Sequence, residues 1–374
     1  MAGIYIHIPF CASRCIYCGF FSTTLHKWQK EYVDALIREY SLRHDYLSNQ
    51  PIETIYLGGG TPSQLSPENL QRLLKCILPL PLRGLGGLAD FELTIECNPD
   101  DVTLEFATLL YNIGVNRVSM GVQTFSDERL RFLRRRHTVH QARTAVSILR
   151  QAGIQNISID LMFGFPDETM EDWQHDIEEA ISLDVEHISA YSLMYEEGTP
   201  LYAMLERGEI NEIDEELSRR MYYHLIDRLT LAGYEHYEIS NFARPGFRSR
   251  HNSSYWNETH YLGLGAGAHS YDGKSRQWNV CDVKEYIEKI SAGVIPAEIE
   301  LIDKQTHYND LITTALRTSD GISLNNCPNA DFLLRNAQQF IDRQLLALTP
   351  DNRLHLTREG LYVSDDIMAE LMWV

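Results

Sequence analysis

The chain has 374 residues, of which 44% are hydrophobic and 23% charged, which is the composition of a globular protein and not of a disordered one. Its 33 Lys and Arg residues stand against 52 Asp and Glu residues, so the formal net charge is -19 and broad binding to nucleic-acid phosphates is not expected. It contains no run of about eighteen apolar residues and no signal segment, which predicts a cytoplasmic protein with no integral membrane segment.

The first half of the chain alternates short β-rich runs with amphipathic helical runs. Strands are expected at 3–8, 54–57, 91–95, 117–120, 157–161 and 187–191, and helices at 28–42, 67–77, 102–111, 127–134, 139–151 and 170–182. Six strands, most of them followed by a helix, predict an α/β fold whose parallel sheet is either doubly wound or curved into a partial (β/α)6 barrel. Residues that bind ligands should then follow the carboxyl ends of the strands.

The pattern changes beyond residue 198. Helices are expected at 214–232, 304–318 and 331–346, a strand at 353–356, one final helix at 357–372 and a loop at 82–89. This order predicts a smaller C-terminal helical, winged-helix-like domain, which in so acidic a chain should pack on the core and not bind nucleic acid. We therefore expect a core at 1–235, a segment that closes it at 236–298 and the C-terminal domain at 299–374.

Three of the seven cysteines, Cys11, Cys15 and Cys18, lie close together after the first strand. Thiolates bind zinc or iron–sulfur clusters, and a structural zinc site normally has four protein ligands, of which His7 or His26 could be the fourth. A [4Fe–4S] cluster on three thiolates would instead leave one iron open to a substrate or cofactor. Three buried free cysteines are the remaining alternative, but the spacing favours a metal-binding loop.

The CxxxCxxC spacing of these cysteines resembles the motif of the radical S-adenosylmethionine (SAM) superfamily, and the resemblance to its coproporphyrinogen-oxidase-like branch covers nearly the whole chain. It implies a [4Fe–4S] cluster on the three thiolates, with SAM on the fourth iron and cleavage of SAM by one electron from the cluster. It also implies that the residues holding or lining SAM are Tyr5, Tyr17, Gly59, Gly60, Thr61, Glu96, Gln123, Arg135, Asp160, Met162 and Met194. Taken singly, each could be a turn, a helix cap or a solvated residue.

Two subfamilies of that branch compete. The oxygen-independent coproporphyrinogen III oxidases, which oxidatively decarboxylate propionate side chains, typically show CxxxCxxCxC after an N-terminal extension; here Phe20 stands at the extra cysteine and the extension is missing. The HemW-type heme chaperones carry HNxxYW, which matches His251, Asn252, Tyr255 and Trp256. The resemblance therefore implies a heme chaperone, with the oxidase-type enzyme as the alternative and a non-catalytic zinc-loop protein as a third hypothesis.

A heme site needs an axial ligand and apolar or aromatic walls. His251 is a candidate axial ligand, and stacking by Trp256 or an orienting role of Asn252 are the alternatives. The resemblance implies heme, apo-hemoproteins such as respiratory enzymes and a bacterioferritin-like heme donor as partners. A homodimer is a further hypothesis.

Overall fold

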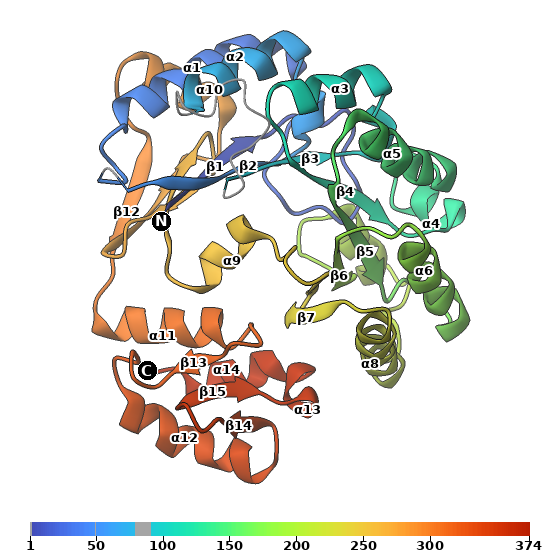
Figure 1. Ribbon diagram of the computed structural model, residues 1–374, viewed down its shortest axis with the longest axis vertical. Helices are drawn as coiled ribbons and strands as arrows, with labels where there is room; N and C mark the ends of the chain where they lie inside the picture. Colours follow the sequence, from blue (N-terminus) through green and yellow to red (C-terminus); the bar gives the residue numbers. More distant parts are fainter. Residues whose placement is uncertain (1, 49, 79–90) are drawn as a thin grey trace.

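The computed structural model describes residues 2–48, 50–78 and 91–374, so the loop expected at 82–89 lies outside the described residues. Six parallel strands stand side by side in chain order: β1 (Ala2–Ile8), β2 (Ile52–Gly59), β3 (Glu92–Cys97), β4 (Arg117–Gln123), β5 (Asn156–Phe163) and β6 (His187–Ser192). The helices between and after them are α1 (Gln29–Leu42), α2 (Pro67–Ile77), α3 (Leu104–Asn112), α4 (Asp127–Phe132), α5 (Val139–Ala152) and α6 (Met170–Ser182). These helices lie along the convex side of a curved sheet (Figure 1), which confirms the partial barrel and not the doubly wound alternative.

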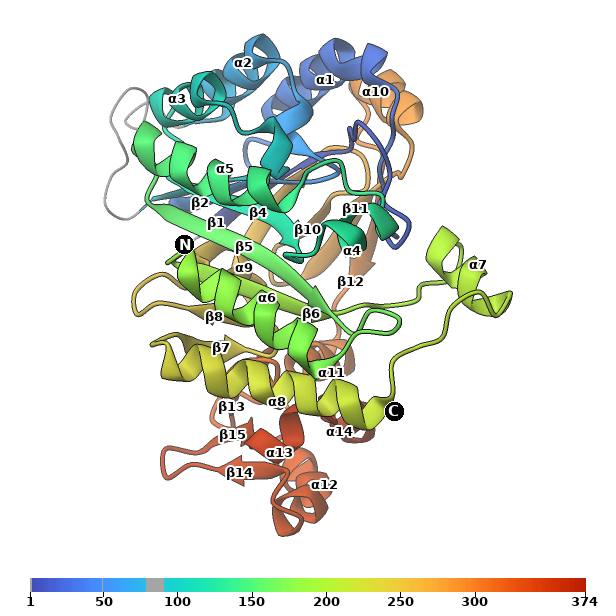
Figure 2. The ribbon, with the colours of Figure 1, turned by 90° about the vertical axis from the view of Figure 1, so that its right-hand side faces the viewer.

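Later segments extend both edges of this sheet to twelve strands without closing it. At the β1 edge lie β9 (His260–Leu264), which is parallel to β1, and then the antiparallel strands β10 (His269–Tyr271), β11 (Ser275–Asn279) and β12 (Ala297–Leu301). At the β6 edge lie β8 (Asn241–Ala243) and β7 (Glu235–Glu238). The connecting helices are α7 (Pro200–Glu206), α8 (Glu215–Leu231), α9 (Arg250–Trp256) and α10 (Val283–Ser291). Figure 2 shows α4 and α7 beside the carboxyl ends of the central strands.

The C-terminal elements form a small unit with an apolar core of its own. They are α11 (Lys304–Ala315), β13 (Ile322–Ser323), α12 (Ala330–Asp342), β14 (Leu346–Leu348), β15 (Arg353–Leu356), α13 (Arg358–Leu361) and α14 (Ser364–Leu371), with the strands in the antiparallel order β13-β15-β14. The domain boundaries given above stay predictions. Among the described residues, no helix has the length and apolar character needed to cross a membrane.

The single helix predicted at 357–372 is wrong, because Tyr362 and Val363 separate two helices and Val363 leaves helical geometry. The Tyr362 hydroxyl donates to the backbone oxygen of Glu215 at the start of α8 (3.1 Å). Val363, with φ -109° and ψ 24°, then starts α14 in a new direction. This contact with α8 is tertiary and outweighs the local helical pattern.

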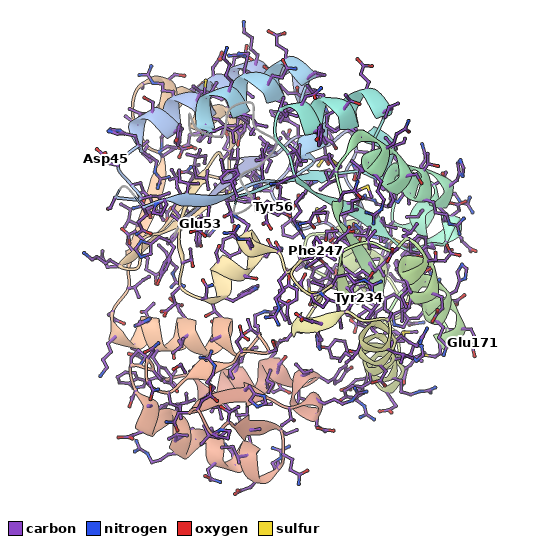
Figure 3. The ribbon with its side chains drawn as sticks, in the orientation of Figure 1. Asp45, Glu53, Tyr56, Glu171, Tyr234 and Phe247 are labelled. Carbon is purple, nitrogen blue, oxygen red and sulfur yellow. The ribbon has the colours of Figure 1, made fainter. Side chains whose placement is uncertain are left out.

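Alternate residues of the central strands point to opposite faces of the sheet, and the two faces differ in polarity. On β1, Ile4, Ile6 and Ile8 are fully buried in the apolar core, whereas Tyr5 points to the concave face. On β2, Tyr56 lies on that same concave face, toward α9 (Figure 3). The helices therefore pack on the aliphatic side, and the polar side is left to line an interior space.

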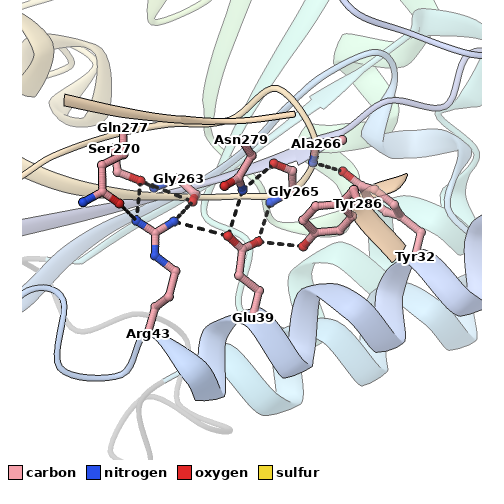
Figure 4. A network of polar contacts seen from close by, with 10 residues as sticks. All are labelled: Tyr32, Glu39, Arg43, Gly263, Gly265, Ala266, Ser270, Gln277, Asn279 and Tyr286. Carbon is pink, nitrogen blue, oxygen red and sulfur yellow. Dashed lines mark hydrogen bonds and ion pairs between the residues drawn. The ribbon is translucent and has the colours of Figure 1, made fainter. Parts of the chain in front are cut away.

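A buried ion pair fastens α1 to the strands that follow α9 (Figure 4). Glu39 is fully buried and accepts hydrogen bonds from Arg43 (3.2 Å), the Asn279 amide (2.8 Å), the Tyr286 hydroxyl (2.6 Å) and the backbone N–H of Gly265 (2.9 Å). All its lone pairs are therefore used, as burial of a charge requires. The network holds the turn after β9 against α1.

Replacing Glu39 should lower the stability of the whole core. Glu39→Ala leaves the buried Arg43 without its counter-charge, and breaking a buried pair in this way costs about 3–5 kcal/mol. Urea unfolding followed by circular dichroism measures the loss. Glu31→Ala, at an exposed position on the same helix, is the control. A loss in Glu39→Ala as small as in the control would contradict this account of the network.

Candidate functional site

A cavity of about 150 Å³ opens at the carboxyl ends of the central strands. The residues predicted to bind the cluster or SAM that line this cavity are Cys11, Cys15, Tyr17, Cys18, Gly59, Gly60, Thr61, Glu96, Gln123, Arg135 and Asp160. It is also lined by Ser13, Arg14, Phe20, Ser22, Cys97, Asn98, Ser119, Gly121, Arg134 and Arg136. The structure thus brings residues from the cysteine loop and from the ends of β2, β3, β4 and β5 to one mouth, and their binding roles stay predictions.

The cysteine loop is held at this mouth by backbone hydrogen bonds. The N–H of Cys11 donates to the oxygen of Thr23 (2.9 Å), and the N–H of Thr23 donates to the oxygen of Pro9 (2.7 Å). Farther along, the N–H of Ile16 donates to the oxygen of Leu133 (3.3 Å) at the end of α4. The first two bonds close the loop on itself and the third joins it to the end of α4, so the three thiols have a defined position.

Two side chains from the barrel point at the sulfur atoms. The Thr61 hydroxyl donates to the Cys11 sulfur (3.4 Å), and the Arg135 guanidinium donates to the Cys15 sulfur (3.6 Å). Burial raises the pKa of the Cys11 thiol, which the hydrogen bond from Thr61 partly offsets, and burial also raises the pKa of Cys18. Metal binding at this loop must therefore release protons from these thiols.

Arg135 is fixed across the mouth by two hydrogen bonds from its second terminal nitrogen. One goes to the Asn98 side-chain oxygen (2.7 Å) and the other to the backbone oxygen of Gly121 (2.7 Å). Its Nε is buried and has no hydrogen-bond partner. A buried donor without a partner lowers the stability of the folded chain, so this nitrogen is suited to a ligand that provides a hydrogen-bond acceptor.

The glycine turn after β2 brings backbone close to the cysteine loop. Gly59 has φ 110°, a conformation that favours glycine. A Cβ on Gly60 would lie 2.6 Å from the backbone carbon of Pro9, so no side chain fits there. The N–H of Gly60 donates to the backbone oxygen of Ile8 (2.9 Å). The turn is thereby packed directly on the segment that carries Cys11.

Two carboxyl groups, Glu96 and Asp160, line the cavity from the concave face. Glu96 accepts from the Tyr56 hydroxyl (2.8 Å) and from the N–H of Gly59 (3.1 Å). Burial raises the pKa of Glu96 to about 7, against the lowering effect of the Tyr56 hydrogen bond and with a further rise from the nearby Asp160. Burial also raises the pKa of Asp160 to about 6, partly offset by the Ser189 hydroxyl. Both groups are acceptors suited to ligand hydroxyls or an ammonium group.

Three other residues predicted to contact SAM lie outside the residues lining this cavity. Tyr5 stands on the concave face and stacks on Tyr56. Met162 is buried in a small apolar cluster with Ile16, and Met194 has 61% of its surface exposed. Their contact with SAM stays a prediction.

The HNxxYW motif forms α9, and its first and fifth residues face the barrel. His251 is fully buried, with its ring nitrogens 2.8 Å from the Thr54 hydroxyl and 3.0 Å from the Tyr255 hydroxyl. Burial lowers the pKa of His251 to about 3, and the nearby Arg117 charge lowers it further. The first N–H groups of α9 donate to the Glu92 carboxylate (3.0 and 3.1 Å). The imidazole is therefore neutral, and both its nitrogens are engaged.

Trp256 lies on a different face of α9 and lines a second cavity, of about 210 Å³, between α9 and the C-terminal unit. The Arg317 guanidinium lies 5.2 Å from the centre of its ring. Arg248 and Arg353 line the same cavity. His251 and Tyr255 are thus hydrogen-bonded to each other on the barrel side of α9, whereas Trp256 lines this interdomain cavity.

Sequence reasoning missed Ser119 as a residue of the mouth, whereas the expectation that ligand-binding residues follow the strand ends already points to Asn98. Ser119 is two residues before Gly121 on β4, so the two-residue period of a strand places both on the concave face. Asn98 directly follows β3, two residues after Glu96. Strand alternation applied to each strand end would have found Ser119.

The stability of the cluster-free chain should fall with rising pH because of Glu96. Its pKa in the folded chain, about 7, lies above the unfolded value of 4.5, so the folded state favours the protonated form and stability is lost as pH rises through this range. Between pH 5 and pH 8 the natural chain should lose about 2–3 kcal/mol more than Glu96→Gln. Urea unfolding at both pH values measures this, with the exposed Glu105→Gln as control. Equal pH dependence in the natural chain and Glu96→Gln would refute it.

Known proteins resemble this chain over part or all of its length. The family model of the Radical SAM superfamily matches residues 5–180. The heme chaperone HemW of Bacillus subtilis is 34% identical over 379 residues, which cover 100% of this chain and 99% of the relative. HemW of Escherichia coli is 37% identical over 274 residues, which cover 71% of this chain and 69% of the relative.

Among solved structures, coproporphyrinogen III oxidase (HemN) from Escherichia coli, described as a radical SAM enzyme, superposes with a TM-score of 0.82. The match covers 99% of this chain and 89% of that chain at 21% sequence identity, and it therefore establishes the fold alone. The identity to relatives along the full chain goes further than the fold. The chain belongs to the radical SAM superfamily and, within it, to the family of the heme chaperones named HemW.

Proposed function

We propose that the protein is a heme chaperone that holds a [4Fe–4S] cluster and SAM in the cysteine cavity, binds heme and delivers it to apo-hemoproteins. The observation that carries this proposal is the meeting of Cys11, Cys15 and Cys18 with a glycine turn and two carboxyl groups at one mouth. It is supported by relatives, similar along the entire chain, that are named heme chaperones.

The residues of the mouth fit an iron–sulfur cluster. Three thiols from one loop are soft ligands, and Thr61 and Arg135 already donate to two of the sulfur atoms, as donors near a cluster commonly do. Among the described residues, no three His, Cys, Asp or Glu side chains are arranged around a single metal ion. A cubane does not require such an arrangement, because each thiolate binds a different iron.

The remaining residues of the cavity fit SAM. The cluster with its open iron supplies the electron for cleavage of SAM when both are bound. Gly59 and Gly60 would let backbone groups approach the methionyl part, and Glu96 and Asp160 would accept from the ammonium or the ribose hydroxyls. Arg135 would place its unpartnered Nε and its positive charge beside the ligand. Tyr17, Thr61 and Gln123 would complete the walls.

Heme binding is assigned to the region of α9. Trp256 is only partly buried and lines the cavity next to the C-terminal unit, so it can contact a planar ligand there. Asn252 is also partly buried, and its orienting role stays part of the proposal. Axial ligation by His251 would first have to break its hydrogen bonds to Thr54 and Tyr255. Respiratory enzymes as acceptors, a bacterioferritin-like donor, a homodimer and a cytoplasmic location are part of the same proposal.

Loss of one loop cysteine should abolish the cluster. After anaerobic reconstitution the natural chain should hold about four irons per chain, and Cys15→Ala about one or none, because two thiolates cannot retain the cubane. Iron and sulfide analysis measures this. Cys97→Ala, which removes a thiol from the same cavity but outside the loop, is the matched control and should keep its iron. Iron retained in Cys15→Ala, or about one zinc and no sulfide in the natural chain, would refute the assignment.

Substitution in α9 should weaken heme binding and leave iron loading intact. Trp256→Ala is expected to lower heme affinity about 5-fold through loss of ring contact, and His251→Ala should lower it as well. Absorbance titration with heme measures both, with His260→Ala, whose ring bonds Gln50 in the loop before β2, as control.

The function itself is tested by transfer of bound heme to an apo-hemoprotein. The heme-loaded chain should give up its heme to the acceptor, and a chain that retains no heme would remove the proposal. Formation of protoporphyrinogen from coproporphyrinogen, SAM and reductant without oxygen would instead favour the oxidase-type alternative.

A further inference from the structure

A stack of aromatic rings joins α9 to the floor of the cysteine cavity. It consists of Tyr5 on β1, Tyr56 on β2 and His251 on α9. The ring centres of Tyr56 and His251 are 5.2 Å apart with the planes at 24°. Tyr5 stacks on both, at 6.2 Å from Tyr56 and 6.4 Å from His251. Figure 3 shows Tyr56 between the sheet and α9.

Tyr56, one of the three rings, also holds the Glu96 carboxylate. The Tyr56 hydroxyl donates to one carboxylate oxygen (2.8 Å), and the N–H of Gly59 donates to the other (3.1 Å). One donor on each oxygen determines how the carboxylate is turned, and hence where its free lone pairs point into the cavity. Because Tyr56 donates this hydrogen bond, the orientation of the Glu96 carboxylate in the cavity depends on the position of the aromatic rings.

The Tyr56–Glu96 contact leaves no room for a side chain at Gly58. A Cβ at Gly58 would lie 2.8 Å from the Tyr56 ring and 2.9 Å from the Glu96 carboxylate oxygen. Gly58 is not among the glycines with positive φ, so a turn does not account for it. Of the three consecutive glycines, the first therefore makes room for the ring and the carboxylate to meet.

The His251 ring is held equally firmly. His251 is bonded at both ring nitrogens, to Thr54 and to Tyr255, and a Cβ at Gly3 would come within 3.2 Å of its Nδ1. A ligand that draws His251 out of these bonds therefore removes one wall of the Tyr56 ring. Because the packed rings have little room to relax, this change reaches Glu96.

We infer that Tyr56 is a positioning residue for the SAM site and that it couples this site to the α9 motif, so that SAM affinity depends on His251. The inference rests on the proposed binding of SAM at Glu96. By linkage, SAM and any ligand that displaces His251 must change each other's affinity by the same factor. Heme bound through His251 would be such a ligand, whereas heme bound at Trp256 alone would leave the stack intact.

The positioning role is tested by equilibrium binding of SAM to cluster-loaded protein without reductant, so that SAM is not cleaved. Tyr56→Phe should weaken SAM binding about 5- to 10-fold, through loss of one hydrogen bond to a charged group. In the Glu96→Gln background the same substitution should change affinity less than about 2-fold, because its effect passes through Glu96. Tyr111→Phe, at a half-exposed position on α3, is the control. Equal losses in both backgrounds, or no loss in Tyr56→Phe, would overturn the positioning role.

The coupling is tested on the same heme-free material. His251→Ala should weaken SAM binding about 3-fold with iron content near that of the natural chain, while His260→Ala should not. Unchanged SAM affinity in His251→Ala would overturn the coupling. Neither experiment contains heme, so their failure is separate from a failure of heme transfer; natural protein that holds its cluster yet binds no SAM would overturn both this inference and the SAM part of the proposed function.

Discussion

Three thiols would leave one iron of the proposed four-iron cluster without a protein ligand, and the proposed function depends on that open position. The cysteine loop is closed on the segment that follows β1 and is bonded to the end of α4, and Cys11, Cys15 and Cys18 face the carboxyl ends of the parallel strands. The glycine turn after β2 and the carboxyl groups of Glu96 and Asp160 lie opposite them. In the proposed function, the open iron of the cluster would thus lie next to acceptors for a nucleoside and an amino acid.

The curved sheet allows this because its two faces carry different side chains. The convex face is aliphatic and packs on the helices, which gives the barrel its stability. The concave face carries carboxyl, hydroxyl and aromatic groups, among them Glu96, Asp160 and Tyr56, whose burial raises each of their pKa values. Buried polar groups of this kind are costly without partners, so the interior is suited to a polar ligand.

The helix α9 stands between the two proposed binding regions. Its barrel side carries His251 against Tyr56, and its other side carries Trp256 against the C-terminal unit. Since Glu92 accepts from the first N–H groups of α9, the helix is fastened to β3 as well. A short element held at both faces can transmit a change at one cavity to the other, which gives a chaperone a physical means to relate SAM occupancy to heme occupancy.

Much of the core could be predicted because long periodic segments report their own structure. The helices at 67–77 and 170–182 and the strand at 353–356 have the predicted bounds, since their apolar spacing and caps are local signals. The strands β8 and β10, of three residues each, could not be predicted, because pairing with distant strands defines them. The position of His251 inside the barrel was equally hidden, since sequence alone cannot say which face of α9 meets the sheet.

The most direct test of the account is electron paramagnetic resonance of the reduced, anaerobically reconstituted protein with and without SAM. Because SAM is expected to bind the iron that the three thiolates leave open, its addition should change the spectrum of a [4Fe–4S]⁺ centre. A cluster signal that is the same with and without saturating SAM, or no such signal at all, would contradict the central claim.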